Sequence, residues 1–185
     1  PGMAGRYPAV VSDAEPVYET ERCLVRNWRP DDEDRMFDLY RRMEVAKWLG
    51  SEPRPMQSRD EAERGISRWA ERNAGLAVGG VWAVERKSDG VVVGTVLLVP
   101  IPKANGEYEV GWHFHPDAWG QGLATESARG ALELAWAHGL PEVLAVVLPG
   151  NGPSLAVCRR LGMTEEGVTD RYYGQLMHLF RIAAP

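Results

Sequence analysis

Hydrophobic and polar residues follow two different spacings in the first part of the chain. Residues 20–28 place successive side chains on alternate sides and predict a strand, whereas apolar residues three and four apart over residues 36–43 predict a helix. A second helix is predicted where Ser58 and Glu61 form a capping box ahead of apolar residues at helical spacing over residues 62–69. The chain therefore begins as a strand followed by two helices.

Valine, leucine and tryptophan dominate the middle of the chain. Residues 81–87 and 91–99 form two such runs joined by a Ser-Asp-Gly turn, so they predict a β-hairpin. Residues 107–115 predict the next strand. A loop with two glycines then leads into a predicted helix over residues 123–138, whose alanines at helical spacing would let it lie close to a sheet.

The last part of the chain predicts three strands and one short helix. Residues 143–148 are continuously apolar, which is typical of a strand covered on both faces. A short helix is predicted over residues 154–161, and residues 164–168 and 176–182 predict two final strands. Together these elements predict a single α/β domain with a mixed sheet.

Length and composition favour one compact domain. The chain has 185 residues and a net charge of −5 without a Lys/Arg block, which disfavours nucleic-acid binding. We expect a domain over residues 17–185 after a flexible segment, residues 1–16, in which Pro1 and Gly2 before Met3 are interpreted as a tag remnant.

The same composition predicts where the protein works. Two cysteines do not suggest a disulfide framework, so a reduced, cytoplasmic setting is expected. The sequence has no apolar run of membrane-spanning length and no signal-peptide order at its start, so no membrane partner is expected.

The glycine loop before residue 123 carries the strongest chemical signal. A helix that begins in such a loop presents free backbone N–H groups and the positive end of its dipole, which together suit a phosphate. A nucleotide P-loop would need a lysine after Gly122, where the chain has Leu123. A dinucleotide fingerprint fits poorly because Thr125 stands at its last position and Glu142 precedes the next strand instead of ending it.

The third interpretation is a seat for the pyrophosphate of coenzyme A. The loop over residues 119–124 resembles the Gln/Arg-x-x-Gly-x-Gly/Ala motif of the GNAT superfamily of N-acetyltransferases: Gly122 and Ala124 match, and Trp119 departs from the usual Gln or Arg. However, Trp-Gly-x-Gly-x-Ala-Thr-Glu at residues 119–126 resembles the form found in the RimJ/RimL-like branch, which acetylates protein N-termini.

Three other segments resemble that branch, in the same order and at similar spacing. They are Thr-Glu-Arg-Cys-Leu-Val-Arg at 20–26, Glu-Val-Gly-Trp at 109–112, and Asn151 and Ser154 followed by Arg-Leu-Gly-Met at 160–163. The resemblance implies a single-domain GNAT fold, with a mixed, mostly antiparallel sheet of about six to seven strands, a splayed parallel pair and flanking helices.

The resemblance also implies acetyl-CoA as cosubstrate, held between the splayed strands 107–115 and 143–148. Backbone groups near Trp112, His113 and Phe114 would bind the pantetheine arm and stabilise an oxyanion. Asn151 would bond the same arm, unless it serves only as a turn residue. The pyrophosphate would be held by amides of the loop and helix start, from Trp119, Gly120, Gln121, Gly122, Leu123, Ala124 and Thr125.

An amine acceptor must lose a proton before it attacks the thioester. An α-amine with a pKa near 8 costs about 1.4 kcal/mol to deprotonate at pH 7, whereas a lysine costs about 4.6 kcal/mol. Glu109 is the predicted catalytic base, directly or through water, although it could instead orient the amine or pair with an arginine. Glu107 lies two residues away on the same face, and the sequence does not separate the two.

The leaving thiolate needs a proton or a hydrogen-bond donor. Much of the superfamily uses a tyrosine seven residues after the asparagine, and here that position is Cys158. The resemblance therefore implies Ser154 as the catalytic donor, with helix-start hydrogen bonding as the alternative. Cys158 is expected to be a small buried residue.

Two further groups of residues bear on the site: a histidine-containing segment and the tryptophans. His113, His115 and Asp117 resemble a His-x-His-x-Asp metal motif, but the histidine such sites need next is replaced by Ala118, so no metal is predicted. The tryptophans should be mostly core residues, although some could also line an acceptor pocket, and the candidates are Trp28, Trp48 and Trp112.

The sequence thus predicts an acetyl-CoA-dependent N-acetyltransferase acting by direct attack of a primary amine through a tetrahedral intermediate. The expected acceptor is a protein N-terminal amine. One alternative is a small amine such as an antibiotic, polyamine or amino acid, and another is a non-catalytic acyl-CoA sensor. Dimerisation is common in the branch, so a homodimer is compatible with the resemblance, although no feature of the sequence indicates one.

Overall fold

The computed structural model describes residues 15–50 and 52–185 and contains one eight-stranded sheet, in the order β1-β2-β3-β4-β5-β6-β8-β7. All but the last two residues of the predicted flexible segment, 1–16, lie outside the described residues. The predicted mixed, mostly antiparallel sheet with one parallel pair is confirmed, but the predicted count of six to seven strands is too low. The short β1 (Tyr18–Glu19) has no alternating pattern of its own and forms by pairing with the next strand.

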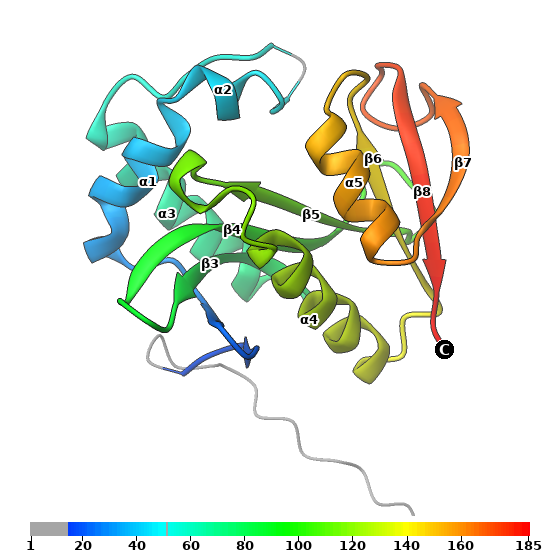
Figure 1. The fold of residues 1–185 in the computed structure, drawn as a ribbon, viewed down its shortest axis with the longest axis horizontal. Helices are drawn as coiled ribbons and strands as arrows, with labels where there is room; N and C mark the ends of the chain where they lie inside the picture. The colour runs from blue at the N-terminus through cyan, green and yellow to red at the C-terminus, as the bar shows by residue number, and fades with distance from the viewer. Residues whose placement is uncertain (1–14, 51) are drawn as a thin grey trace, which may run out of the picture.

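The first five strands form an antiparallel meander (Figure 1). After β1 they are β2 (Cys23–Arg26), β3 (Gly80–Arg86), β4 (Val91–Pro100) and β5 (Tyr108–Phe114). The predicted hairpin is confirmed as β3 and β4.

The first predicted strand is shorter than expected. It ends at Arg26, whose buried guanidinium lies 2.7 Å from Asp32 and 2.8 Å from Glu85. These two ion pairs hold the end of β2 beside the start of the following helical segment.

Helical segments of the first half follow β2. They are the 3-10 turn η1 (Pro30–Asp32), α1 (Glu33–Tyr40), α2 (Met43–Ala46) and α3 (Arg59–Ala74). The single helix predicted across residues 36–43 is wrong, because α1 ends at Tyr40 and the side chain of Met43 is 51% exposed at the start of α2. Half of the predicted capping box forms: the Ser58 hydroxyl accepts a hydrogen bond from the Glu61 amide at 3.3 Å.

The second half of the chain contains the connection between the two parallel strands of the sheet. It comprises the 3-10 turn η2 (Pro116–Ala118), α4 (Leu123–Ala137), β6 (Glu142–Val147), α5 (Gly152–Arg160), β7 (Thr164–Thr169) and β8 (Met177–Ala183). Strands β5 and β6 are parallel and share one register pair, Glu109 with Leu144. Figure 1 shows the sheet opening between these strands, with α4 and α5 on the near face.

Two hydrophobic clusters cover the two faces of the sheet. One contains the predicted small face of α4, where Ala128, Ala131 and Ala135 are fully buried. The other packs α1 and α3 against β3 and β4 through residues such as Met36 and Ile66. The helices therefore hold the sheet from both sides, and the opening between β5 and β6 remains as the gap in this packing.

Among the described residues, no helix combines the length and apolar character needed to cross a membrane. Cys23 and Cys158 are both free and buried.

Candidate active site

A cavity of about 540 Å³ lies where β5 and β6 separate. Beyond the Glu109–Leu144 pair, no register pair joins these strands in the described part of the chain. The facing strand edges therefore keep backbone N–H and C=O groups for an extended ligand. Both strands contribute to the wall, which includes Val110, Gly111, Trp112, His113, Ala145, Val146, Val147 and Leu148.

The glycine loop forms an open cradle at the start of α4. Gly120 and Gly122 have φ angles of 73° and 78°, the left-handed region that favours glycine, and Gly122 is the helix N-cap. A Cβ would meet nothing within 4 Å at Gly120, and only the Arg22 guanidinium at 3.5 Å at Gly122. Within the described residues, no acceptor is hydrogen-bonded to the amides of residues 120–125. These amides and the helix dipole can therefore bind an anion.

The side chains of three residues predicted to bind acetyl-CoA contact other parts of the protein and stabilise the loop. The Trp119 indole is 51% exposed and donates to the Phe114 carbonyl at 2.7 Å. Gln121 donates from its side-chain amide to the Asp117 carbonyl at 2.9 Å. Leu123 packs in the core. Trp119 and Leu123 can therefore offer only backbone groups to a phosphate, and the contact of all three residues with acetyl-CoA stays a prediction.

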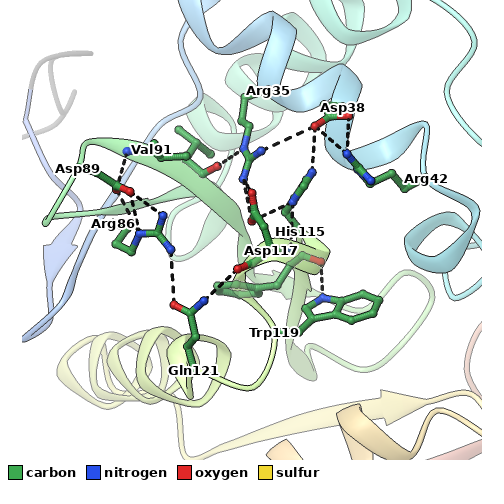
Figure 2. Close-up of polar contacts among 12 residues, drawn as sticks. Arg35, Asp38, Arg42, Arg86, Asp89, Val91, His115, Asp117, Trp119 and Gln121 are labelled. Atoms are coloured by element: carbon green, nitrogen blue, oxygen red, sulfur yellow. Dashed lines mark hydrogen bonds and ion pairs between the residues drawn. The ribbon is translucent and has the colours of Figure 1, made fainter.

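A charged network joins the loop to α1 (Figure 2). His115 lies between two carboxylates, with Nε2 2.9 Å from Asp38 and Nδ1 2.8 Å from Asp117. Arg35 donates to Asp117 at 2.9 Å and to the Val92 carbonyl at 2.6 Å. Burial opposes ionisation of Asp38, but hydrogen bonds from Arg42, His115 and other donors outweigh it and lower the pKa of Asp38 to about 2. The Asp38 carboxylate therefore stays ionised at neutral pH, and the contacts of the network fix the position of the loop.

His113 and His115 have different partners. The Nδ1 atom of His113 is 3.1 Å from the Tyr40 hydroxyl, and burial lowers the pKa of His113 to about 4. Its side chain is therefore neutral at pH 7. Phe114 has its side chain in the core, and so only its backbone can contribute to a ligand site.

A second set of contacts holds the other side of the loop. The Glu126 carboxylate accepts hydrogen bonds from the Thr20 hydroxyl at 2.6 Å and from the Arg22 amide at 2.8 Å. Arg22 also donates to the Gln121 carbonyl at 2.9 Å. Sequence reasoning did not assign Arg22 to the site, although its Thr-x-Arg segment was part of the resemblance.

Glu109 is the acidic residue of the cavity wall. It accepts a hydrogen bond from the Tyr173 hydroxyl. Burial raises the pKa of Glu109, and the Tyr173 hydrogen bond and the charge of Arg72 oppose that rise. Glu107 instead binds Arg171 and Tyr172, at 2.9 and 2.8 Å, and does not line the cavity. The structure thus separates two glutamates that the sequence left as alternatives.

The start of α5 contributes two polar residues to the cavity. The Asn151 side-chain oxygen accepts from the Ser154 amide at 3.3 Å, so Asn151 caps the helix while it also lines the cavity. The Ser154 hydroxyl has no hydrogen-bond partner within the described chain and faces the same space. Cys158 is fully buried, and burial raises its pKa to about 12, so its thiol stays protonated at neutral pH.

Part of the cavity wall is built by segments distant in sequence. Trp48 and Trp112 line it, in agreement with two of the three candidates from the sequence, whereas Trp28 is buried in the α1–α3 core instead. Gln175, in the loop between β7 and β8, donates to the Gly50 carbonyl at 3.4 Å and bridges two walls of the cavity.

Comparison with known proteins agrees with this arrangement. The family model described as acetyltransferase (GNAT) domain matches residues 22–164. The protein named "Uncharacterized N-acetyltransferase YoaA" from Bacillus subtilis (strain 168) is 26% identical over 164 residues, which cover 86% of this chain and 89% of that protein.

Solved structures extend the likeness to the whole fold. The ribosomal-protein-S5-alanine acetyltransferase from Vibrio fischeri superposes with a TM-score of 0.72 at 18% identity, over 90% of this chain and 95% of that one. The microcin C7 self immunity acetyltransferase MccE, in complex with acetyl-CoA and AMP, gives 0.76 at 14% identity, over 89% and 93%. At these identities the two structures show a common fold alone.

Proposed function

The chain belongs to the family of acetyltransferase (GNAT) domains, and from this premise we propose that it acetylates the α-amine of a protein N-terminus. It is an acetyl-CoA-dependent N-acetyltransferase acting on an amine. The observation that carries the proposal is the cavity in which the splayed β5–β6 edges, Glu109 and Ser154 meet.

The described residues offer backbone groups that suit both parts of the donor. Unpaired edges of β5 and β6 match the amide groups of a pantetheine arm, and the free amides of residues 120–125 match a pyrophosphate. A backbone N–H near Trp112 would stabilise the oxyanion formed when the amine adds to the thioester carbonyl.

Proton removal falls to Glu109. The amine nitrogen forms the new bond to the acetyl carbon as its proton passes to the Glu109 carboxylate, directly or through water. Burial raises the pKa of Glu109, which makes it a stronger base than an exposed glutamate. An α-amine needs only about 1.4 kcal/mol for deprotonation at pH 7, and this modest demand favours an α-amine over a lysine.

The C–S bond then breaks, and the thiolate accepts a hydrogen bond from Ser154. Cys158 cannot take the tyrosine's usual role because it is buried in the core. Ser154→Ala is expected to lower kcat at least about tenfold, the loss of one hydrogen bond to a charged group worth about 1.5–3 kcal/mol, while KM for acetyl-CoA changes less. Steady-state kinetics checks this; a raised KM with unchanged kcat would mean that Ser154 only binds the donor.

The Tyr173 hydroxyl lowers the pKa of Glu109, the proposed base. Tyr173→Phe removes a hydrogen bond that lowers the pKa of Glu109, so that pKa rises further. Because the base must be ionised, the acid limb of the kcat/KM profile is expected to move to higher pH. Tyr172→Phe is the matched control, since Tyr172 binds Glu107 outside the cavity. Equal profiles for the two variants would remove Tyr173 from this role.

The acceptor assignment is supported against two alternatives. The cavity wall is not strongly acidic, since Arg72 stands beside Glu109, which disfavours a polyamine or other polycation. An ionisable glutamate inside the cavity favours turnover over a non-catalytic sensor. The fold shared with a ribosomal-protein-S5-alanine acetyltransferase is consistent with a protein acceptor, whereas the likeness to MccE keeps a small amine as the second candidate.

A thiol-release assay tests the proposal. Purified protein and acetyl-CoA are combined with a panel of N-terminal peptides and, separately, with small amines, and products are identified by mass spectrometry. Acetylation of peptide α-amines is the expected result. Turnover of a small amine alone would overturn the protein acceptor and leave the enzyme class intact.

The enzyme is proposed to work in a reducing, cytoplasmic compartment. Two free, buried cysteines support this setting.

A further inference from the structure

The cavity wall contains an arginine that forms no ion pair with a described acidic residue. Arg72 lies in the last turn of α3 and lines the cavity. Its guanidinium forms no hydrogen bond or ion pair with any residue that the structure describes. By contrast, Arg22, Arg35 and Arg171 near the site are each paired with a carboxylate. Arg72 therefore has its hydrogen-bond donors available to a ligand.

Arg72 and Glu109 carry opposite charges on the wall of the same cavity. Among the described cavity-lining residues they carry the only formal charges at neutral pH, because burial keeps His113 neutral. The charge of Arg72 also opposes the burial-driven rise in the pKa of Glu109. The guanidinium is thus within electrostatic reach of the predicted base without being bonded to it.

The anion that Arg72 could bind is not the pyrophosphate. The phosphate cradle is at the start of α4, which packs against β4 and β5 within the first hydrophobic cluster. Arg72 comes from α3, which packs in the second cluster with α1. The guanidinium shares the cavity with Trp48 and Tyr173, and no residue of the glycine loop is among the described residues that line this cavity. Because the acetyl group of the donor carries no charge, an anion at Arg72 would come from the acceptor.

We propose that Arg72 binds a carboxylate of the acceptor, so that the preferred substrate is an N-terminal segment with Asp or Glu close behind its α-amine. Arginine binds carboxylates through two parallel hydrogen bonds, which gives both affinity and orientation. An acceptor with its ammonium near Glu109 and its carboxylate at Arg72 complements both charges of the wall. A second positive charge at the same place would be repelled. This inference rests on the proposed N-terminal acceptor.

Matched peptides test the charge preference. Three peptides differ only at one early position, which is Glu, Gln or Lys, and kcat/KM is measured for each. With the native enzyme we expect the Glu peptide to exceed the Gln peptide by about tenfold, as for one charge-assisted contact. Arg72→Gln is expected to bring that ratio close to one, and Arg72→Glu to favour the Lys peptide.

Two controls separate recognition from folding. Arg68→Gln alters an arginine of the same helix that does not line the cavity, and it should keep the native ratio. Calorimetry with acetyl-CoA should give the native affinity for Arg72→Gln. An Arg72 variant that lowers kcat/KM equally for all three peptides would overturn the inference while leaving the N-terminal acceptor in place.

A different set of results is expected if the acceptor is not a protein N-terminus. If only small amines are acetylated, the same variants are compared on an amino acid and its amide, which differ in the carboxylate. An Arg72-dependent preference for the free acid would retain the anion site. An equal rate for acid and amide would overturn it.

Discussion

Gly122→Val is expected to weaken acetyl-CoA binding by at least about 100-fold, the loss of roughly 2.7 kcal/mol. The valine Cβ branch would occupy the space in front of the amides at the start of α4, where a pyrophosphate must approach within hydrogen-bond distance. Each charge-assisted hydrogen bond lost there is worth about 1.5–3 kcal/mol. Isothermal titration calorimetry with acetyl-CoA measures the effect directly.

The chain contains a matched control for backbone strain. Gly139 has the same φ as Gly122, 78°, and a Cβ there would meet nothing within 4 Å. It follows the opposite end of α4. Gly139→Val should therefore impose a similar strain of about 1–3 kcal/mol on folding and leave the Kd for acetyl-CoA unchanged. Equal affinities for the Gly122 and Gly139 variants would mean that the phosphate seat lies elsewhere.

Glu109→Gln is expected to lower kcat by about 10²- to 10⁴-fold, the usual contribution of a positioned general base. Glutamine keeps the size of the side chain and can still accept a hydrogen bond from Tyr173, but it cannot take a proton from the amine. The affinity for acetyl-CoA should not change. Part of the lost activity should return as the pH approaches the pKa of the amine, because the acceptor then enters already neutral.

Glu107→Gln is the control for this substitution. Its carboxylate binds Arg171 and Tyr172 outside the cavity, so kcat is expected to stay within about threefold of the native value. Rapid single-turnover kinetics would separate chemistry from product release in both variants. A normal single-turnover rate for Glu109→Gln would assign deprotonation to water or to another group.

The sequence predicted the parts of the site that depend on local spacing. The glycine loop, the helix after it and the short helix that follows Asn151 each depend on residues close together in the chain, so a short motif contains the needed information. The same motif could not predict that the Trp119 and Gln121 side chains donate hydrogen bonds to the backbone carbonyls of Phe114 and Asp117. Those contacts depend on how η2 folds back on the strand end.

Tertiary packing determined the rest of the site. Tyr173 and Arg72 come from a loop and a helix about 100 residues apart, with no spacing rule that relates them to Glu109. Glu107 and Glu109 looked equivalent because strand periodicity gives only the face of a residue. The structure distinguishes them because Glu107 precedes β5 and is bound by Arg171 and Tyr172, whereas Glu109 lies within β5 and lines the cavity.

The single register pair between β5 and β6 has a consequence for stability as well as for catalysis. The sheet is interrupted at this seam, and an extended donor that bonds to both edges would act as an inserted strand that joins its two halves. Binding to the native state alone stabilises it by about 2.7 kcal/mol when the ligand is at 100 times its Kd. The supply of acetyl-CoA is therefore expected to set how stable the folded protein is, in addition to how fast the amine is acetylated.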